Sequence, residues 1–273
     1  MKDLPCYDDY DIIKECGQGV YGKVHKALHK KSNTMVALKM LKGDLRNDSG
    51  IQIVYYREFR ILQKLNHCNI VKLIDIFADS REDDKIKPFD IYYSFEYLDH
   101  DLTGLLQSHF RFTEPIVKTL IRQMLEGLQY LHGLKIIHRD IKSANMLVSK
   151  RGVVKIADFG LAKELHVQDS TKKRKLTANV VTRWYKCPEL LMGLEYSYGV
   201  DVFGIGIICG DLYRRKPLLP GASDQDQLQK IFDFVGDPST IKWVPKTLFS
   251  FMPCKKPLGI DKFAQEFKYI SIM

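Results

Sequence analysis

The chain has 273 residues, of which 45% are hydrophobic and 27% are charged, as expected of a globular protein with a substantial core. No apolar run approaches the roughly 18 residues of a membrane span, and the first residues lack the apolar segment of a secretory signal. The six cysteines are scattered without a Cys-x-x-Cys pair, which argues against a disulfide framework or a zinc site. We therefore expect a protein of the reducing cytosol or nucleus that is not in a membrane.

The net charge is +9, from 42 basic and 33 acidic residues. This surplus fits either a solvated basic surface or attraction to an acidic or phosphorylated partner, and the charge alone does not choose between them. Because aromatic residues do not alternate with basic ones in a compact patch, we do not expect direct nucleic-acid binding.

The first hundred residues have the pattern of β-strands interrupted by one helix. Short β-branched or apolar runs between turn residues predict strands at 10–16, 23–29, 34–41, 70–77 and 89–97. The spacing of apolar residues between positions 51 and 65 predicts a helix, and the polar run 79–84 predicts a turn.

The pattern after residue 101 is mainly helical, with helices predicted at 115–134, 200–212 and 224–235. The first of these has an apolar stripe at helical spacing, made of Val117, Leu120, Ile121, Met124, Leu125, Leu128 and Leu131. A strand-rich lobe followed by a helix-rich lobe predicts a ligand-binding cleft near residues 96–101.

Residues 17–24 form a G-x-G-x-x-G-x-V element. The same glycine spacing occurs in dinucleotide-binding folds, but there a helix follows directly, whereas the residues after Gly22 read as a strand. The element therefore predicts a glycine-rich hairpin whose tip lies close over phosphate groups.

Lys39 lies in the apolar strand that follows this hairpin. A lone lysine is usually a solvated surface group, but beside a phosphate loop its ammonium suits the α- and β-phosphates. Glu58 on the next helix is its candidate partner, although an exposed helix carboxylate is the alternative reading.

Residues 138–145 contain His-Arg-Asp followed by Asn145, and Asp158-Phe159-Gly160 follows thirteen residues later. Phosphoryl transfer needs a carboxylate that orients a hydroxyl and accepts its proton, and oxygen ligands that hold Mg²⁺. Asp140 suits the first role, and Asn145 and Asp158 suit the second. Lys142 can place a positive charge near the transferred group.

These motifs resemble the eukaryotic protein kinases over nearly all of residues 10–240. Residues 50–58 stand where the cyclin-dependent branch carries its cyclin-contacting helix. The segments that resemble the transcription-elongation kinases (the P-TEFb, Bur and carboxy-terminal-domain kinase group) are 95–106, 180–185 and 216–221.

The resemblance implies an α+β, bilobal protein kinase fold over residues 10–273. A β-rich N-lobe with one regulatory helix is expected at about 10–96, a hinge at about 96–101 and a helical C-lobe at about 102–273. Kinases of this group continue for a few tens of residues beyond the position of Met273, so the C-lobe is expected to be C-terminally shortened. The arginine that normally pairs with the carboxylate at the position of Glu189 is then also missing.

The resemblance also implies roles for individual residues. Phe95 matches the gatekeeper of the adenine pocket, and the backbone of Glu96 and Leu98 is expected to bind adenine. The whole set expected at ATP is Gly17, Gln18, Gly19, Val20, Tyr21, Gly22, Val24, Ala37, Lys39, Glu58, Phe95, Glu96, Leu98, Asp101, Leu147 and Asp158. The expected catalytic set is Asp140, Lys142, Asn145 and Thr182, with Mg²⁺ held by Asn145 and Asp158.

Thr177 matches the activating phosphorylation site of the family, whose phosphate is clamped by three basic positions, here Arg57, Arg139 and Lys163. Lys163 replaces the usual arginine, so one bidentate contact becomes a point charge. Thr182, with Val181, lies in the segment that shapes a preference for proline after the phosphoacceptor. The basic run 172–175 is either a nuclear import signal or a solvated or partner-facing stretch.

Some positions depart from the family pattern. Tyr55 and Tyr56 replace smaller residues and Gln52 replaces proline on the cyclin-contacting helix, which predicts a remodelled partner surface. Val20 replaces the threonine beside Tyr21, so inhibitory phosphorylation of the glycine loop is not expected. Asp201 is retained and is expected to brace the catalytic loop.

The leading hypothesis is therefore a cyclin-dependent Ser/Thr-Pro kinase that uses ATP and Mg²⁺, located in the nucleus with the cytoplasm as a second compartment, with the repeat tail of RNA polymerase II as substrate. The alternative is a pseudokinase or scaffold that binds a cyclin without turnover, because the C-lobe is expected to be short. A small-molecule kinase is disfavoured, because the long segment around Thr177 resembles a peptide-docking element.

Overall fold

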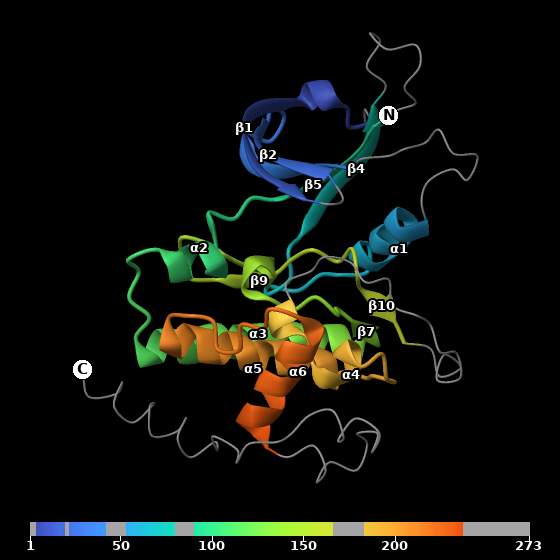
Figure 1. Cartoon of the computed structure of the whole chain (residues 1–273). Coiled ribbons are helices and arrows are strands. Elements are labelled where there is room, and N and C mark those ends of the chain that lie inside the picture. Colours follow the sequence, from blue (N-terminus) through green and yellow to red (C-terminus); the bar gives the residue numbers. More distant parts are fainter. Residues whose placement is uncertain (1–3, 20–21, 42–52, 80–89, 166–182, 237–273) are drawn as a thin grey trace.

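The computed structural model describes residues 4–19, 22–41, 53–79, 90–165 and 183–236. Figure 1 shows a β-sheet lobe above a mainly helical lobe, with helix α1 (Ile53–Leu62) beside the sheet. The predicted α+β, two-lobed architecture is confirmed.

A five-stranded antiparallel sheet in the order β1-β2-β3-β5-β4 forms the upper lobe. Its elements are η1 (Tyr7–Asp9), β1 (Tyr10–Gly19), β2 (Gly22–His29), β3 (Thr34–Leu41), β4 (Leu73–Asp79) and β5 (Asp90–Glu96). Val36 and Leu38 alternate with less buried residues along β3, as the period of two in a strand requires. Asn33 adopts φ 52° in the turn before β3, a conformation that asparagine tolerates better than most residues.

The lower lobe is built around α3 and α5. Its elements are β6 (His100–Asp101), α2 (Leu102–Gln107), α3 (Glu114–Gly133), β7 (Ile136–Ile137), η2 (Ser143–Asn145), β8 (Met146–Val148), β9 (Val154–Ile156), β10 (Lys163–Glu164), η4 (Arg183–Tyr185), α4 (Pro188–Leu191), α5 (Gly199–Arg214) and α6 (Asp224–Val235). None of the helices in the described ranges is long and apolar enough to cross a membrane.

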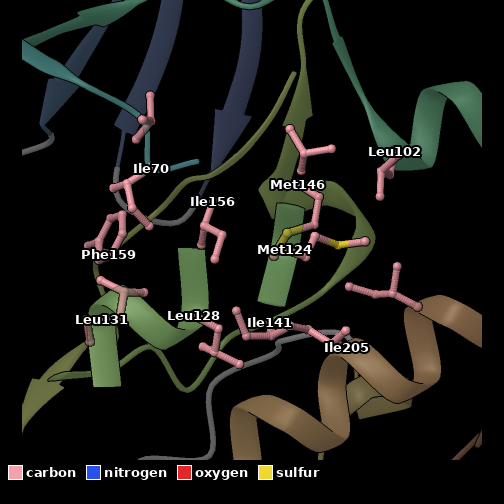
Figure 2. Close-up of a cluster of buried hydrophobic side chains, with 14 of the residues drawn as sticks. Ile70, Leu102, Met124, Leu128, Leu131, Ile141, Met146, Ile156, Phe159 and Ile205 are labelled. Atoms are coloured by element: carbon pink, nitrogen blue, oxygen red, sulfur yellow. The ribbon is translucent and has the colours of Figure 1, made fainter. Parts of the chain in front are cut away.

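One hydrophobic core joins the two lobes (Figure 2). Ile156 of β9 lies between Ile70, which precedes β4, and residues of α3 such as Leu128. Ile141, in the loop of residues 138–145, rests on α5, where Gly204 and Ile205 are buried beneath it. The core therefore fixes the loop of residues 138–145 against the most buried helix of the lobe.

The structure corrects the sequence prediction in three places. The predicted strand at 70–77 begins only at Leu73, because Ile70 forms a parallel bridge with Ile156 and the Val71 N–H donates to the Ile156 carbonyl. The predicted core residue Leu125 is 43% exposed and lines a surface hollow of about 370 Å³ beside Tyr213, because α5 covers only part of the apolar stripe. The short helices α2 and α4 were not predicted. The predicted turn at 79–84 lies almost wholly outside the described residues.

Candidate active site

The register of the sheet aligns three predicted site residues. Gly17 pairs with Val24, and Val24 pairs with Lys39, so the glycine element and the lysine occupy one row across β1, β2 and β3. Gly22 has φ 150°, and a Cβ there would lie 1.8 Å from the Met40 carbonyl oxygen, so only glycine fits. A Cβ at Gly17 would meet no atom within 4 Å, and Gly17 is exposed, so no described neighbour requires a glycine there. Ala37 pairs with Phe95 on the neighbouring strand.

Lys39 connects the two lobes. Its Nζ lies 2.9 Å from Oε1 of Glu58 on α1 and 3.6 Å from Oδ1 of Asp158 in the lower lobe. Burial by itself lowers the pKa of Lys39, but the charges of Glu58 and Asp158 outweigh it, and the pKa is raised. Burial likewise raises the pKa of Asp158, and Lys39 with other basic groups brings it below its usual value. Glu58 is therefore a buried ion-pair partner, and the exposed-carboxylate alternative is wrong.

Asp140, Lys142 and Asn145 meet in one hydrogen-bonded group. Lys142 Nζ donates to Oδ2 of Asp140 at 2.7 Å, and Asn145 Nδ2 donates to the same oxygen at 3.0 Å. Asn145 Nδ2 also donates to the Asp140 carbonyl at 2.8 Å. Both contacts use the amide nitrogen, and within the described ranges no hydrogen bond reaches the Asn145 side-chain oxygen, so this oxygen can act as a metal ligand.

The backbone of this loop is held from below by Asp201 of α5. The fully buried Asp201 carboxylate accepts the N–H of His138 at 2.9 Å and that of Arg139 at 2.8 Å. Arg139 has φ 69°, a conformation that is unfavourable for a residue with a long side chain and needs such support. The predicted bracing by Asp201 is confirmed. His132 Nε2 also donates to Asp201, at 3.0 Å, a contact that was not predicted.

His138 links the loop to the Asp158-Phe159-Gly160 motif. Its Nε2 donates to the Ala157 carbonyl at 3.0 Å, and its Nδ1 accepts the Asp140 N–H at 3.3 Å. These two contacts together fix the tautomer with the proton on Nε2. The His138 ring meets the buried Phe159 ring edge-on at 5.0 Å, and Asp158 beside it has φ 65°.

The predicted hinge lies between β5 and α2. Glu96 accepts the Lys72 N–H and the Lys155 ammonium, both at 2.7 Å, so its side chain binds protein rather than ligand. Asp101 Oδ1 caps α2 by accepting the Gly104 N–H at 2.9 Å. Leu98 is buried, whereas Phe95 and Leu147 are half-buried against the core.

The three predicted phosphate-clamping residues come from three separate segments, namely α1, β10 and the loop after β7. Arg57 is exposed on α1, and Lys163 lies on β10. Lys64, just after α1, forms a partly exposed 2.6 Å ion pair with Glu164 of β10. Arg139 already donates to the Leu161 carbonyl at 2.6 Å and to the Tyr196 hydroxyl at 2.9 Å.

Several predicted positions lie outside the described residues, namely Val20, Tyr21, Gln52, Thr177, Val181, Thr182 and the basic run 172–175, and the side chains of Gln18 and Tyr55 are not described either. Glu189 is half-buried in the first turn of α4 and forms no ion pair within the described ranges.

A polar group beneath the loop was not predicted. The Tyr185 hydroxyl donates to Asp211 at 2.7 Å and lies 3.1 Å from the Ser143 hydroxyl, while Asp211 accepts the Leu218 N–H at 2.7 Å. Burial, followed by the charge of Asp211, raises the pKa of Tyr185. The sequence carried no signal for this group, because its residues come from separate segments.

Comparison with known proteins agrees with the resemblance to protein kinases that the motifs indicate. The family model described as "Protein kinase domain" matches residues 10–252. The chain is 41% identical to the Bur serine/threonine-protein kinase of Gibberella zeae over 242 residues, which are 85% of this chain and 45% of that protein. It is 40% identical to Cyclin-dependent kinase C-1 of Arabidopsis thaliana over 246 residues (86% and 48%) and 38% identical to Probable cyclin-dependent kinase 9 of Schizosaccharomyces pombe over 242 residues (85% and 41%). The chain thus spans a little under half the length of these relatives, and the subgroup indicated by its motifs is confirmed.

Proposed function

Since the chain belongs to the protein kinase domain family, we propose that it is a cyclin-dependent serine/threonine kinase that transfers the γ-phosphoryl group of ATP to Ser/Thr-Pro sites. The observation that carries this proposal is the Asp140–Lys142–Asn145 group, placed in the same lobe as the Asp158 carboxylate that Lys39 contacts. Catalytic groups are present and partnered, which favours turnover over a scaffold role.

The residues divide the chemistry among them. Asp140 is placed to accept the proton of the substrate hydroxyl. As that proton leaves, the hydroxyl oxygen bonds to the γ-phosphorus, and the bond between the γ-phosphorus and the leaving diphosphate oxygen breaks. Lys142 holds the Asp140 carboxylate and supplies positive charge for the transferred group. Lys39, fixed by Glu58, provides a point charge for the α- and β-phosphates.

Protein kinase domains generally use ATP with a divalent metal ion, and the donors here suit Mg²⁺. The Asp158 carboxylate and the free amide oxygen of Asn145 are the hard oxygen ligands that this ion prefers, and no cluster of three or more His, Cys, Asp or Glu in the described ranges offers a competing site. When bound, the ion neutralises charge on the phosphates.

Cyclin-dependent kinases occur among the relatives, so a cyclin on the exposed face of α1 is the proposed activator. The repeat tail of RNA polymerase II, in the nucleus, is the proposed substrate because the motifs of the chain resemble those of the transcription-elongation kinases. We propose that phosphorylation of Thr177 by another kinase completes activation, with Arg57, Arg139 and Lys163 receiving the phosphate.

The test is a γ-phosphate transfer assay with the co-purified cyclin and two peptides, a Ser-Pro repeat and its Ser-Ala counterpart. We expect transfer to the Ser-Pro peptide, and its loss by about 10³-fold or more in Asp140→Asn with nucleotide affinity unchanged. Normal nucleotide and cyclin binding without transfer in the wild-type chain would instead support the scaffold alternative.

A further inference from the structure

A basic corner lies at the end of the lower lobe, away from the catalytic residues. It is made of His109, Phe110 and Arg111 in the loop between α2 and α3, and of Arg215 and Lys216 after α5. In Figure 1 this loop descends from α2 to the start of α3 on the side of the molecule opposite to β10. The sequence did not reveal the corner, because its two segments lie far apart along the chain: Arg215 and Phe110 are separated by 105 positions.

Arg215 holds the two segments together. Its Nη2 donates to the Phe110 carbonyl at 2.5 Å and to the Ser108 carbonyl at 3.3 Å. Its guanidinium carbon lies 5.9 Å from the centre of the Phe112 ring. Arg215 has φ 55°, the left-handed conformation in which α5 ends. The loop is thereby fixed in one shape before any ligand arrives.

Phe110 is the exposed aromatic residue of this corner. It is 42% exposed, and its ring meets Phe112 edge-on at 4.9 Å, so one edge is anchored and the rest faces solvent. Among the described residues no other phenylalanine is as exposed. Aromatic and arginine side chains held in a fixed orientation are typical of protein-binding surfaces.

The residues next to Phe110 and Arg215 along the chain carry no negative charge. His109, Arg111 and Lys216 are exposed, and neither Arg111 nor Lys216 has an ion-pair partner in the part of the chain that the structure describes. The nearest acidic residue along the chain, Glu114, is paired with Lys118 at 2.5 Å. The segments 108–113 and 213–217 contain no Asp or Glu. Unpaired cations beside an exposed ring complement a negatively charged ligand that has an apolar side chain.

We propose that the basic corner is a docking site for an acidic segment of a protein partner, with an aromatic or aliphatic side chain of that segment packed on Phe110. A nucleic-acid strand would need a longer track of phosphate contacts than two short segments provide. The site is independent of the phosphotransfer residues, so it adds to the proposed activity and does not depend on it.

The experiment measures binding by fluorescence anisotropy of the full chain, with its co-purified partner if one is present. The probe is a short fluorescein-labelled peptide of alternating Asp and Glu around one Phe, and a Gly-Ser peptide of equal length around the same Phe is the reference. We expect the acidic peptide to bind at least about tenfold more tightly than the reference at low salt and to weaken at physiological ionic strength.

The decisive variant is Arg111→Glu/Lys216→Glu, in which both residues are exposed and Arg215 is left in place to hold the loop. Its matched control is Lys150→Glu/Arg151→Glu, which makes the same change of net charge at another exposed site. We expect about tenfold weaker binding in the first variant and less than about twofold in the control. Thermal melting of both variants confirms that they remain folded.

A double-mutant cycle that combines Phe110→Ala with replacement of the peptide Phe by Ala tests the apolar contact. The losses of binding free energy from the two changes should not add. Equal weakening in both charge-reversal variants would show attraction to the net charge alone and overturn the proposal. Tighter binding of a short oligouridylate that displaces the peptide would assign the corner to nucleic acid and also overturn it, as would the absence of peptide binding.

Discussion

Lys39 Nζ lies 2.9 Å from Oε1 of Glu58, whose side chain is only 2% exposed. This contact ties β3 to α1, and the 3.6 Å contact of the same lysine with Asp158 ties both to the lower lobe. The position of α1, on which the proposed cyclin would act, is thus coupled directly to the lysine charge that we propose for the nucleotide phosphates.

Glu58→Gln should lower kcat/KM for ATP by about 10²-fold, because Lys39 loses the buried charge that fixes it. It should also lower the melting temperature, since breaking a buried pair leaves a charge with incomplete compensation. Steady-state kinetics and thermal melting measure the two effects. Glu164→Gln is the control, because the Lys64–Glu164 pair is far more exposed and should matter little. Equal effects of both variants would contradict this interpretation.

Asp201→Asn should loosen the catalytic loop. The amide keeps one acceptor oxygen, whereas Asp201 accepts two backbone N–H groups on separate oxygens, from His138 and Arg139. One buried donor is left unpaired at a cost of about 1–3 kcal/mol. We expect a lower free energy of unfolding in urea and a fall in kcat with KM for ATP nearly unchanged. A change confined to KM would show that Asp201 does not act through the loop.

Two glycines of α5 offer a matched pair of substitutions. A Cβ at Gly204 would lie 2.8 Å from the Ile141 side chain and 3.0 Å from its carbonyl oxygen, whereas a Cβ at Gly206 would meet nothing within 4 Å. Gly204→Ala should therefore destabilise the protein by about 1–3 kcal/mol and lower kcat. Gly206→Ala should stabilise it by about 0.5–1 kcal/mol, because alanine favours the helix. Equal behaviour of the two variants in urea unfolding would refute the close packing of the loop on α5.

Tyr10 provides a pH-dependent test of the sheet lobe. Its hydroxyl lies 3.3 Å from Asp75, and burial, followed by the nearby negative charge of Asp75, raises the pKa of Tyr10 to about 12. The folded state therefore holds this proton more tightly than the unfolded state, in which the pKa has its ordinary value of 10.0. The contribution to stability is complete below about pH 10 and is lost as the pH rises towards 12.

Between about pH 9 and pH 11, the wild-type protein should therefore lose about 1.4 kcal/mol more unfolding free energy than Tyr10→Phe, which has no proton to release. Urea unfolding of both proteins across this range measures the difference. Parallel curves would show that the tyrosine titrates alike in the folded and unfolded states.

The sequence alone determined the type of chemistry and the main elements. The glycine element, Lys39, Asp140, Asn145 and Asp158 were recognisable because phosphoryl transfer needs particular residue types at fixed spacings along single segments. The long helices were predictable to within about two residues, because their apolar periodicity is local, as α6 over Asp224–Val235 illustrates.

Only the tertiary structure decided the contacts between distant segments. The pairing of His132 with Asp201, the Tyr185–Asp211 group and the basic corner held by Arg215 depend on how separate elements pack. The exposure of Leu125 has the same origin, because a periodic stripe shows which face of a helix is apolar but not how much of it a neighbouring helix covers. Spacing along the chain carries local geometry, whereas these features arise from the close packing of side chains from different elements.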